Sequence, residues 1–335
     1  MNFSLAIDIG SHYIKVAEGY LKKGRIVLRT AGITRNPFPD AHLNLNENDQ
    51  KKFVNFLKDF LRKVNIKSRD TVCCVSGNGL IVHYFDIPDI PENEIKNAVE
   101  LEAIQVIPGG IEKLEYDYAI LPSPSPKNRT IMFIGYPKIK CDFFVNTLIM
   151  SGLRPIIMDV AGLSLSNCYE NLSKNNSKNV AIIDTGAKQT NLAIINSEGF
   201  VFIRQIDFGG DTVNAEISRV KNISRYDAEQ FKKNPDNREE VKKSLKNVIP
   251  DTLQEIQTSI RYFETRTQKK IEKFLLTGGS SLLPDFVEIV EENLKIHGEI
   301  WKPMAGLIEH CYTSEPQCTE VCFSQVLGLI SRKLL

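Results

Sequence analysis

Two short turns in the sequence carry an aspartate and a glycine directly after an apolar run. Asp8-Ile9-Gly10 is the first of these turns, and Asp184-Thr185-Gly186 is the second. A tight turn after a buried strand points successive backbone N–H groups into one concavity, which attracts phosphate oxygens. Glycine in such a turn removes the Cβ that would keep the phosphates away from the backbone. The two turns therefore predict two phosphate-binding loops.

Side chains near the two turns could complete such a site. Ser11, Lys15 and Thr190 could supply further donors, with Lys15 acting as a point charge. Asp8 and Asp184, facing each other across a cleft, could hold Mg²⁺ mostly through water, which is the coordination that this ion prefers. Because two carboxylates aimed at a triphosphate would repel it without a cation between them, the pattern predicts Mg²⁺ beside the bound phosphates.

Two glycine pairs add to this signal. Gly278-Gly279-Ser280 follows an apolar run, and a helix is expected from about Pro284. Gly209-Gly210 precedes a helix that is expected to begin near Asp211. A Gly-Gly pair between a strand and a helix lets a flat base or ribose lie against bare backbone. A single pair would be interpreted as a plain tight turn, but four glycine signals in this order predict a nucleotide site.

The two Asp-x-Gly turns belong to an internal repeat and lie about half the chain apart. Residues 3–33 predict a strand, the turn and two further strands, and residues 179–207 repeat this plan. Asp and Gly favour turns for local reasons, which would explain one occurrence. The same flanking strands twice favour a duplicated unit, so we expect two similar α/β lobes that face each other.

The segment between the repeats predicts an inserted unit over about residues 80–150. Strands are expected at 80–86, 116–121 and 130–136, and helices at 92–106 and 138–150. The proline-rich stretch 122–126 cannot pair in a sheet and predicts an exposed loop. The predicted division of the chain is a first lobe at 1–79, an inserted subdomain at 80–152, first lobe and inter-lobe connection at 153–178, a second lobe at 179–314 with an outcrop at about 211–272, and a C-terminal helix at 315–335 that returns to the first lobe.

Composition limits the classes of partner and location. The chain has 335 residues, which is long enough for two cores, and its formal net charge of +1 gives no electrostatic reason to bind nucleic acid or an anionic membrane surface. No uninterrupted apolar stretch reaches the roughly 18 residues that a bilayer crossing needs. Asp8 falls where an export signal would be apolar, and the 7 scattered cysteines suit a reducing compartment. These features predict a cytoplasmic protein.

The order of the motifs resembles that of the actin-like ATPase superfamily. The stretches that carry the resemblance to its phosphate-1, phosphate-2 and adenosine motifs are DIGSHYIKV, DTGAKQTNLAII, GGDTVNAEI and LLTGGSSLLP. The segments IPENEIKNAVELEAIQVIP, SRYDAEQFKK and FSQVLGLISRKLL narrow the likeness to the PilM/FtsA-like branch, and the chain is similar to the PilM family of type IV pilus assembly proteins over nearly its whole length. The resemblance implies an actin-like fold of two ribonuclease H-like lobes, with a 1C-type subdomain inserted in the first. It also implies that Glu229 and Lys232 contact the ribose or base.

The same resemblance implies a cofactor and a partner. PilM proteins bind ATP with Mg²⁺ between the lobes and dock the short cytoplasmic N-terminus of the inner-membrane protein PilN in a groove between the first lobe and subdomain 1C. Pilus motor ATPases are further candidate partners, and such an adaptor is cytoplasmic and peripheral at the inner membrane through its partner. Val82, Tyr84 and Ile95 are candidates for the groove wall, with a place in the internal core equally open.

Two departures from the family pattern bear on hydrolysis. His12 and Tyr13 follow Ser11 where relatives carry small hydroxyl residues. His12 is therefore either a bulky loop residue with no role in binding or a neighbour of the phosphate. Hydrolysis needs a group that orients the attacking water, and the expected inter-lobe connection IIMDVAGLSLSNCYE contains no Gln. Asp159 is the candidate for that task, with a helix-start role as the alternative. We therefore expect nucleotide binding with slow or absent turnover.

Three rival interpretations fit the sequence less well. An FtsA-like division protein would carry a membrane-binding helix after a flexible linker, and the terminal FSQVLGLISRKLL shows no such linker. A small-molecule kinase of the superfamily needs a general base and a substrate pocket that the inserted unit does not visibly supply. A zinc site at His310, Cys311, Cys318 and Cys322 lacks the Cys-x-x-Cys spacing of structural sites.

Overall fold

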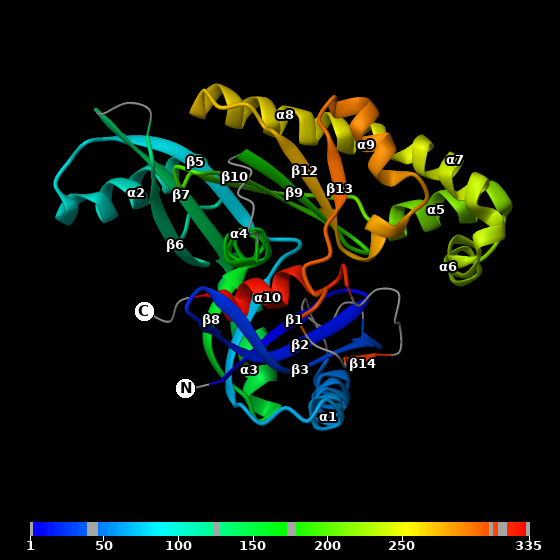
Figure 1. The fold of residues 1–335 in the computed structure, drawn as a ribbon. Helices are drawn as coiled ribbons and strands as arrows, with labels where there is room; N and C mark the ends of the chain where they lie inside the picture. The colour runs from blue at the N-terminus through cyan, green and yellow to red at the C-terminus, as the bar shows by residue number, and fades with distance from the viewer. Residues whose placement is uncertain are drawn as a thin grey trace.

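Two large β-sheets form the framework of the molecule (Figure 1). The computed structural model describes residues 3–38, 46–123, 127–172, 179–307, 311–313 and 320–332. The first sheet has the strand order β14-β3-β2-β1-β4-β8. Its strands are β1 (Ser4–Ile9), β2 (Tyr13–Lys22), β3 (Arg25–Arg35), β4 (Asp70–Val75), β8 (Arg154–Val160) and β14 (Tyr312–Thr313).

The second sheet repeats the arrangement of the first. Its order is β11-β10-β9-β12-β13, in which β9 pairs antiparallel with β10 and parallel with β12, as β1 does with β2 and β4. The strands are β9 (Asn179–Thr185), β10 (Thr190–Asn196), β11 (Val201–Ile206), β12 (Lys273–Thr277) and β13 (Gly298–Ile300). The prediction of two similar α/β lobes is thus confirmed in the strand order.

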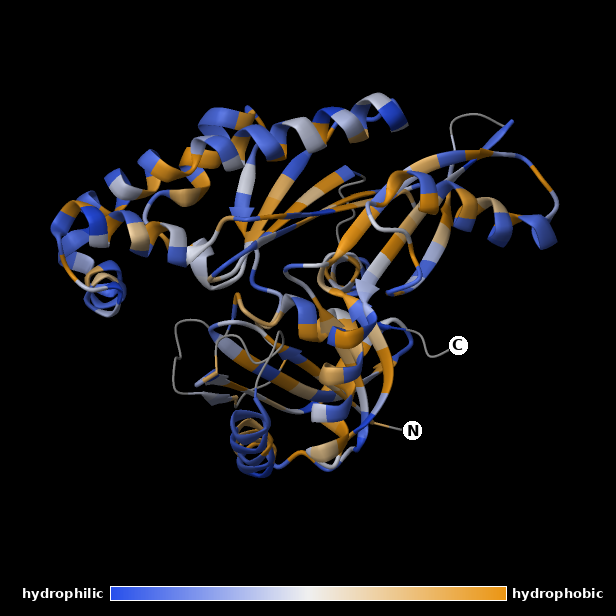
Figure 2. Ribbon diagram, turned by 180° about the vertical axis from the view of Figure 1, so that it is seen from behind, coloured by the Kyte–Doolittle hydropathy of each residue, from blue (hydrophilic) through white to orange (hydrophobic). Residues whose placement is uncertain are grey.

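Helices bury the apolar strands of both sheets. Figure 2 shows hydrophobic colour concentrated in the strands and hydrophilic colour on the outer helices. Strand β10 is buried along its whole length, and its residues 192–195 form a continuous apolar run. The outer helices are α1 (Glu47–Lys63) and α3 (Lys138–Met150) in the first lobe, and α5 (Gly210–Lys221), α6 (Arg225–Lys233), α7 (Arg238–Val248), α8 (Pro250–Thr267) and α9 (Phe286–Leu294) in the second.

Two helices lie between the sheets and pack against each other. These are α4 (Ala161–Leu172) and α10 (Ser324–Ser331), and every residue of α10 is buried. A Cβ on Gly328 would lie 1.7 Å from the carbonyl oxygen of Ser164, so α10 can approach α4 this closely because residue 328 is glycine. Since α10 also packs on β1 and β2 while α4 packs on β10 and β11, this helix pair joins the lobes.

A small unit with its own core is inserted between β4 and β8. It consists of the antiparallel sheet β5-β7-β6 and helix α2, with β5 at Ile81–Pro88, β6 at Leu114–Leu121, β7 at Asn128–Pro137 and α2 at Glu92–Val106. We call these four elements the inserted unit. Ile95, Val99 and Phe133 are among its core residues. Helix α3, which the sequence placed in the same segment, packs on β6 and β7 of the inserted unit and also on β8 and α1 of the first lobe.

Some sequence expectations concern parts of the chain that the structure does not describe. Residues 124–126 of the proline-rich loop lie outside the described residues, as does the boundary placed at 314 and 315. The zinc candidates His310 and Cys318 also lie outside them. In the described residues, none of the helices combines the length and apolar character that a bilayer crossing requires.

Candidate functional site

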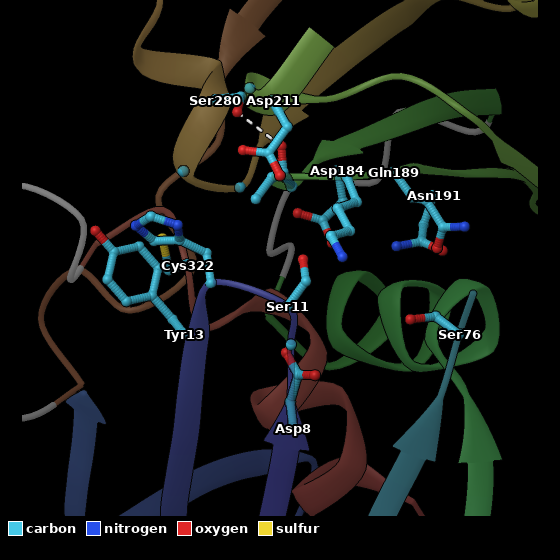
Figure 3. A pocket seen from close by; sticks show the side chains of 18 of the residues that line it. Asp8, Ser11, Tyr13, Ser76, Asp184, Gln189, Asn191, Asp211, Ser280 and Cys322 are labelled. Atoms are coloured by element: carbon cyan, nitrogen blue, oxygen red, sulfur yellow. Dashed lines mark hydrogen bonds between the residues drawn. The ribbon is translucent and has the colours of Figure 1, made fainter. Parts of the chain in front are cut away.

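Both Asp-x-Gly turns open into one cleft between the lobes. The cleft has a volume of about 520 Å³, and both Gly10 and Gly186 line it. Asp8 and Ser11 enter from the first lobe and Asp184 from the second, toward the same space (Figure 3). A shared cavity is the geometric condition on which the two-turn nucleotide site depends.

The two turns are built in the same way. The N–H of Gly10 donates to the carbonyl of Tyr13, and the N–H of Gly186 donates to the carbonyl of Gln189, both at 2.9 Å. In each hairpin the aspartate lies opposite a residue seven positions later, Lys15 for Asp8 and Asn191 for Asp184. The repeat therefore extends from strand order to individual hydrogen bonds and to cross-strand pairs.

The first-lobe turn places an ion pair at the floor of the cleft. Nζ of Lys15 lies 2.5 Å from Oδ2 of Asp8, and both side chains are largely buried. Burial alone would lower the pKa of Lys15, but the negative charge of Asp8 reverses this and raises that pKa above its usual value. Lys15 is thus a fixed positive charge beside the turn, suited to a phosphate group.

The second-lobe turn presents a buried carboxylate. Asp184 is 6% exposed, and its Oδ2 accepts a hydrogen bond of 2.5 Å from Nε2 of Gln325. Burial raises the pKa of Asp184 to about 6, while Lys15 and Gln325 oppose that rise. A carboxylate kept ionised at such a buried place is suited to a hydrated divalent cation.

The glycine pairs leave room where a side chain would collide with the phosphate turn. Gly278 has a φ of +86°, and a Cβ there would lie 2.5 Å from Oδ1 of Asp184 and from the carbonyl oxygen of Thr185. A Cβ on Gly209 would lie 2.3 Å from the carbonyl oxygen of Ala187. Such a backbone cradle beside a carboxylate and a lysine fits a nucleotide phosphate chain with its magnesium ion.

Helix α6 contributes a polar cluster to the second-lobe wall. Nζ of Lys232 lies 2.6 Å from Oε2 of Glu229, which also accepts a 2.7 Å hydrogen bond from Nδ2 of Asn214. Burial alone would raise the pKa of Glu229, but Lys232 and Asn214 hold it below its usual value. Lys232 also donates to the carbonyl of Gly210, so this cluster is joined to the glycine pair that begins α5.

Comparison with known proteins identifies the family. The sequence model of the family described as type IV pilus assembly protein PilM matches residues 6–320. The chain belongs to the PilM family. The resemblance stated from the motifs is thereby confirmed.

Solved structures confirm the actin-like fold. The chain is similar to a structure described as the PilM-PilN type IV pilus biogenesis complex, with a TM-score of 0.80, 21% identity, and coverage of 98% of this chain and 97% of that one. For the ethanolamine utilization protein EutJ of Carboxydothermus hydrogenoformans the TM-score is 0.60 at 10% identity, covering 99% and 90%. For MreB5 of Spiroplasma citri bound to ADP it is 0.52 at 11% identity, covering 98% and 95%.

Most of the residues predicted to bind nucleotide in this PilM-family protein line the cleft. They are Asp8, Gly10, Ser11, Lys15, Asp184, Gly186, Gly210, Glu229, Lys232, Gly278, Gly279 and Ser280. The hydroxyl of Ser280 donates to the carbonyl of Gly186 at 2.7 Å, which braces the second turn (Figure 3). Gly209 does not line the cleft, but its backbone lies close to the carbonyl groups of Gly186 and Ala187 in that turn.

Thr190 is not among the residues that line the cleft. It lies opposite Thr185, and its hydroxyl donates to the carbonyl of Phe208 at 2.9 Å. Cross-strand partners share a face of the sheet, so Asn191, the partner of Asp184, is the residue that lines the cleft. The prediction chose Thr190, which is one position before Asn191. In the first hairpin Lys15 lies seven positions after Asp8, and the same spacing counted from Asp184 would have indicated Asn191.

Asp159 also lies outside the lining of the cleft. Its Oδ1 accepts a 2.8 Å hydrogen bond from the N–H of Val160, and its Oδ2 is 3.5 Å from Nε of Arg332. Burial raises the pKa of Asp159, and Arg332 opposes this. The side chain thus joins the end of β8 to the end of α10, which favours the structural alternative over a water-orienting role.

Several cleft residues were not singled out from the sequence. They are Ser76, Asn78, Asn191, Asp211 and Gln325. Gln325 lies far along the chain from both turns, in a helix where only Ser324 and Ser331 are also polar, and no local pattern marks it. His12 does line the cleft; burial lowers the pKa of its imidazole, and Glu229 of the second lobe opposes this shift.

Two of the three candidates for a partner groove have other roles. Ile95 is 2% exposed, inside the core of the inserted unit. Oη of Tyr84 accepts a 2.7 Å hydrogen bond from the N–H of Ile203, and its ring stacks on Phe202 at 5.0 Å. Tyr84 therefore joins the inserted unit to the second lobe, while Val82 is half-buried against the main core.

The described residues give no support to a zinc site. Cys322 lines the cleft, and Cys311 is half-buried with a pKa raised to about 11 by burial. In the described parts of the chain, no group of three or more His, Cys, Asp or Glu side chains is arranged to hold a metal ion directly.

Proposed function

We propose that this PilM-family protein binds Mg·ATP between its lobes and serves as an adaptor of the type IV pilus inner-membrane assembly platform. The observation that carries the nucleotide part is the pair of equivalent turns that open into one cleft, each with a buried aspartate. Family membership carries the pilus part.

Each group of the cleft has a place in this proposal. Backbone N–H groups of the two turns and the ammonium of Lys15 would hold the phosphates. Asp8 and Asp184 would hold Mg²⁺ mostly through water, and that ion would offset the charge of the triphosphate. Glu229 and Lys232 would contact the ribose or base.

The proposed partner is the N-terminal cytoplasmic peptide of a PilN-like inner-membrane protein. Support comes from the likeness to a chain of the structure described as a PilM-PilN complex, over almost the full length of both chains. The proposed site is a groove between the first lobe and the inserted unit, and pilus motor ATPases are further candidate partners. The adaptor would be cytoplasmic and peripheral at the membrane through that peptide.

We also propose that ATP turnover is slow or absent. Asp159, the acid considered for orienting an attacking water, lies outside the lining of the cleft and interacts with Arg332. The purified protein should therefore turn over ATP far more slowly than the roughly 10 per second of a typical enzyme. Brisk release of ADP that depends on a small-molecule substrate would favour a kinase instead.

Calorimetry with Asp184→Asn tests the nucleotide site. The substitution keeps the size of the side chain and removes its charge, so Mg·ATP affinity should fall about tenfold or more. Equal affinity in variant and wild type would rule out this role for Asp184. A pull-down with candidate cytoplasmic tails of pilus membrane proteins, with and without ATP, tests the adaptor role; filaments that sediment only with ATP would favour an FtsA-like protein.

A further inference from the structure

The carboxamide of Gln325 touches strands of both lobes at the cleft. Gln325 is the second residue of α10 and is 7% exposed. Its Nε2 donates to Oδ2 of Asp184 at 2.5 Å, and its Oε1 accepts from Sγ of Cys74 at 3.7 Å. Cys74 lies in β4 of the first lobe and Asp184 in β9 of the second, so one amide bridges the two sheets.

The chemistry of its neighbours fixes the orientation of this amide. An ionised carboxylate can only accept, so the NH₂ group of Gln325 must face Asp184. The amide oxygen then faces the thiol of Cys74, which remains an S–H donor because burial raises its pKa well above the ordinary value. Each end of the carboxamide therefore makes a hydrogen bond, and a flip of the group would lose both contacts.

Asp184 is in turn held on both sides of its carboxylate. Gln325 occupies Oδ2, and Oδ1 lies against the bare backbone of Gly278, where a Cβ would come within 2.5 Å. Asp184 belongs to the turn that presents its N–H groups to the cleft. The direction of its carboxylate is thus set by a side chain from the helix that joins the lobes.

We propose that Gln325 is a positioning residue of the nucleotide site, which aims the Asp184 carboxylate at the hydrated magnesium ion. The inference rests on the proposed function and adds a residue from α10 to it. Since α10 packs against α4, the same hydrogen bond joins the metal side of the site to the inter-lobe helix pair. Binding of Mg·ATP, and not of ATP alone, depends on this bond.

Calorimetry with Gln325→Met tests the inference, because methionine keeps the length and cannot donate. The measured quantity is the ratio of ATP affinity with Mg²⁺ to ATP affinity in EDTA. This ratio should fall about tenfold in Gln325→Met, since the lost hydrogen bond is made to a charged group. Affinity in EDTA should stay within about twofold of wild type. Gln254→Met, at an exposed position of α8, is the matched control and should leave the ratio unchanged.

A double-mutant cycle with Asp184→Asn separates positioning from packing. If Gln325 acts through Asp184, adding Gln325→Met to Asp184→Asn should change the ratio by less than about twofold. An unchanged ratio in Gln325→Met alone, or fully additive effects in the cycle, would overturn the inference. A wild-type protein that binds no ATP would overturn the proposed function instead. Gln325→Leu, which also cannot donate to Asp184, repeats the test if the methionine variant does not fold.

Discussion

Lys15 lies directly opposite Asp8 across the β1–β2 hairpin, with its Nζ 2.5 Å from Oδ2 of the aspartate. In the second lobe the equivalent position opposite Asp184 is Asn191. The two hairpins thus share register and turn, but one contributes a cation to the cleft and the other an amide. At this position the first hairpin therefore supplies a positive charge that can bind phosphate and the second does not, although the two hairpins have the same backbone arrangement.

Lys15→Met should weaken ATP binding about tenfold or more, because it removes the buried charge nearest the first phosphate turn. It should also destabilise the protein by about 3 kcal/mol, since Asp8 would remain buried without its partner. Calorimetry and urea denaturation measure the two effects. Lys22→Met, at an exposed position of the same strand, is the control and should change neither. A variant that binds ATP like wild type would contradict the role of Lys15.

Gly278→Ala should disturb the second turn more than Gly24→Ala, although both glycines have positive φ, +86° and +72°. Nothing lies within 4 Å of a Cβ at Gly24, so that substitution measures backbone strain alone, about 1 kcal/mol. At Gly278 the Cβ would also collide with Asp184 and the carbonyl of Thr185. We expect a further loss of about 2 kcal/mol or more in denaturation and weaker Mg·ATP binding. Equal effects for the two variants would show that the backbone cradle tolerates a side chain.

The sequence predicts contacts between residues that are close together along the chain, but not contacts between residues that are far apart. The Asp-x-Gly hairpins are local patterns, so their strands, turns and aspartates were predicted from neighbouring residues. Thr190 was wrong as a cleft residue because a one-residue error in register moves a side chain to the other face of a strand. Gln325 and Asp184 are 141 positions apart, and Tyr84 and Ile203 are 119 apart. Such contacts arise when whole lobes pack, and no local pattern indicates them.

Tyr84→Phe should loosen the contact between the inserted unit and the second lobe. The ring could still stack on Phe202, but the N–H of Ile203 would lose its acceptor, which costs about 1–2 kcal/mol. Urea denaturation should show this loss, and hydrogen exchange at the Ile203 amide should become faster. Tyr226→Phe, at a side chain that is 67% exposed, is the control. Unchanged exchange at Ile203 would mean that the hydroxyl does not protect this edge of the sheet.

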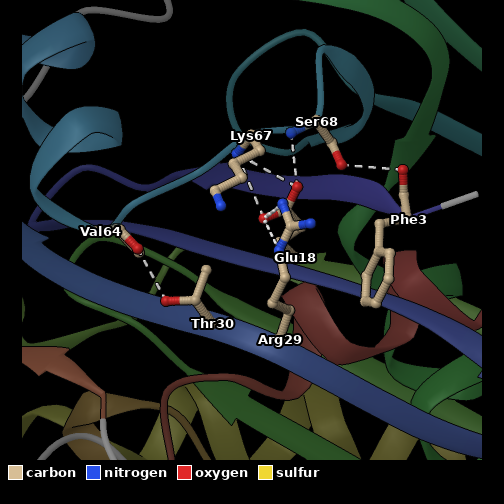
Figure 4. A network of polar contacts seen from close by, with 7 residues as sticks. All are labelled: Phe3, Glu18, Arg29, Thr30, Val64, Lys67 and Ser68. Atoms are coloured by element: carbon tan, nitrogen blue, oxygen red, sulfur yellow. Dashed lines mark hydrogen bonds and ion pairs between the residues drawn. The ribbon is translucent and has the colours of Figure 1, made fainter.

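Glu18→Gln should lower stability in a way that depends on pH. Glu18 is fully buried away from the cleft and accepts hydrogen bonds from Nε of Arg29 at 2.7 Å and from the N–H of Ser68 at 2.6 Å (Figure 4). Burial alone would raise the pKa of Glu18, but these donors hold it below its ordinary value.

Because the pKa of Glu18 is lower in the folded state, its ionised form stabilises the fold above the ordinary glutamate pKa of about 4.3. This stabilisation is lost as the pH falls through the lowered folded pKa. The wild type should therefore exceed Glu18→Gln by about 2 kcal/mol at pH 7, and the difference should shrink in acid. Urea denaturation at pH 7 and pH 3 measures it, with the exposed Glu92→Gln as the control. A difference that stays constant with pH would mean that the ionised form of Glu18 is not what stabilises this network. ATP affinity should be the same in Glu18→Gln and wild type, because Glu18 lies away from the cleft.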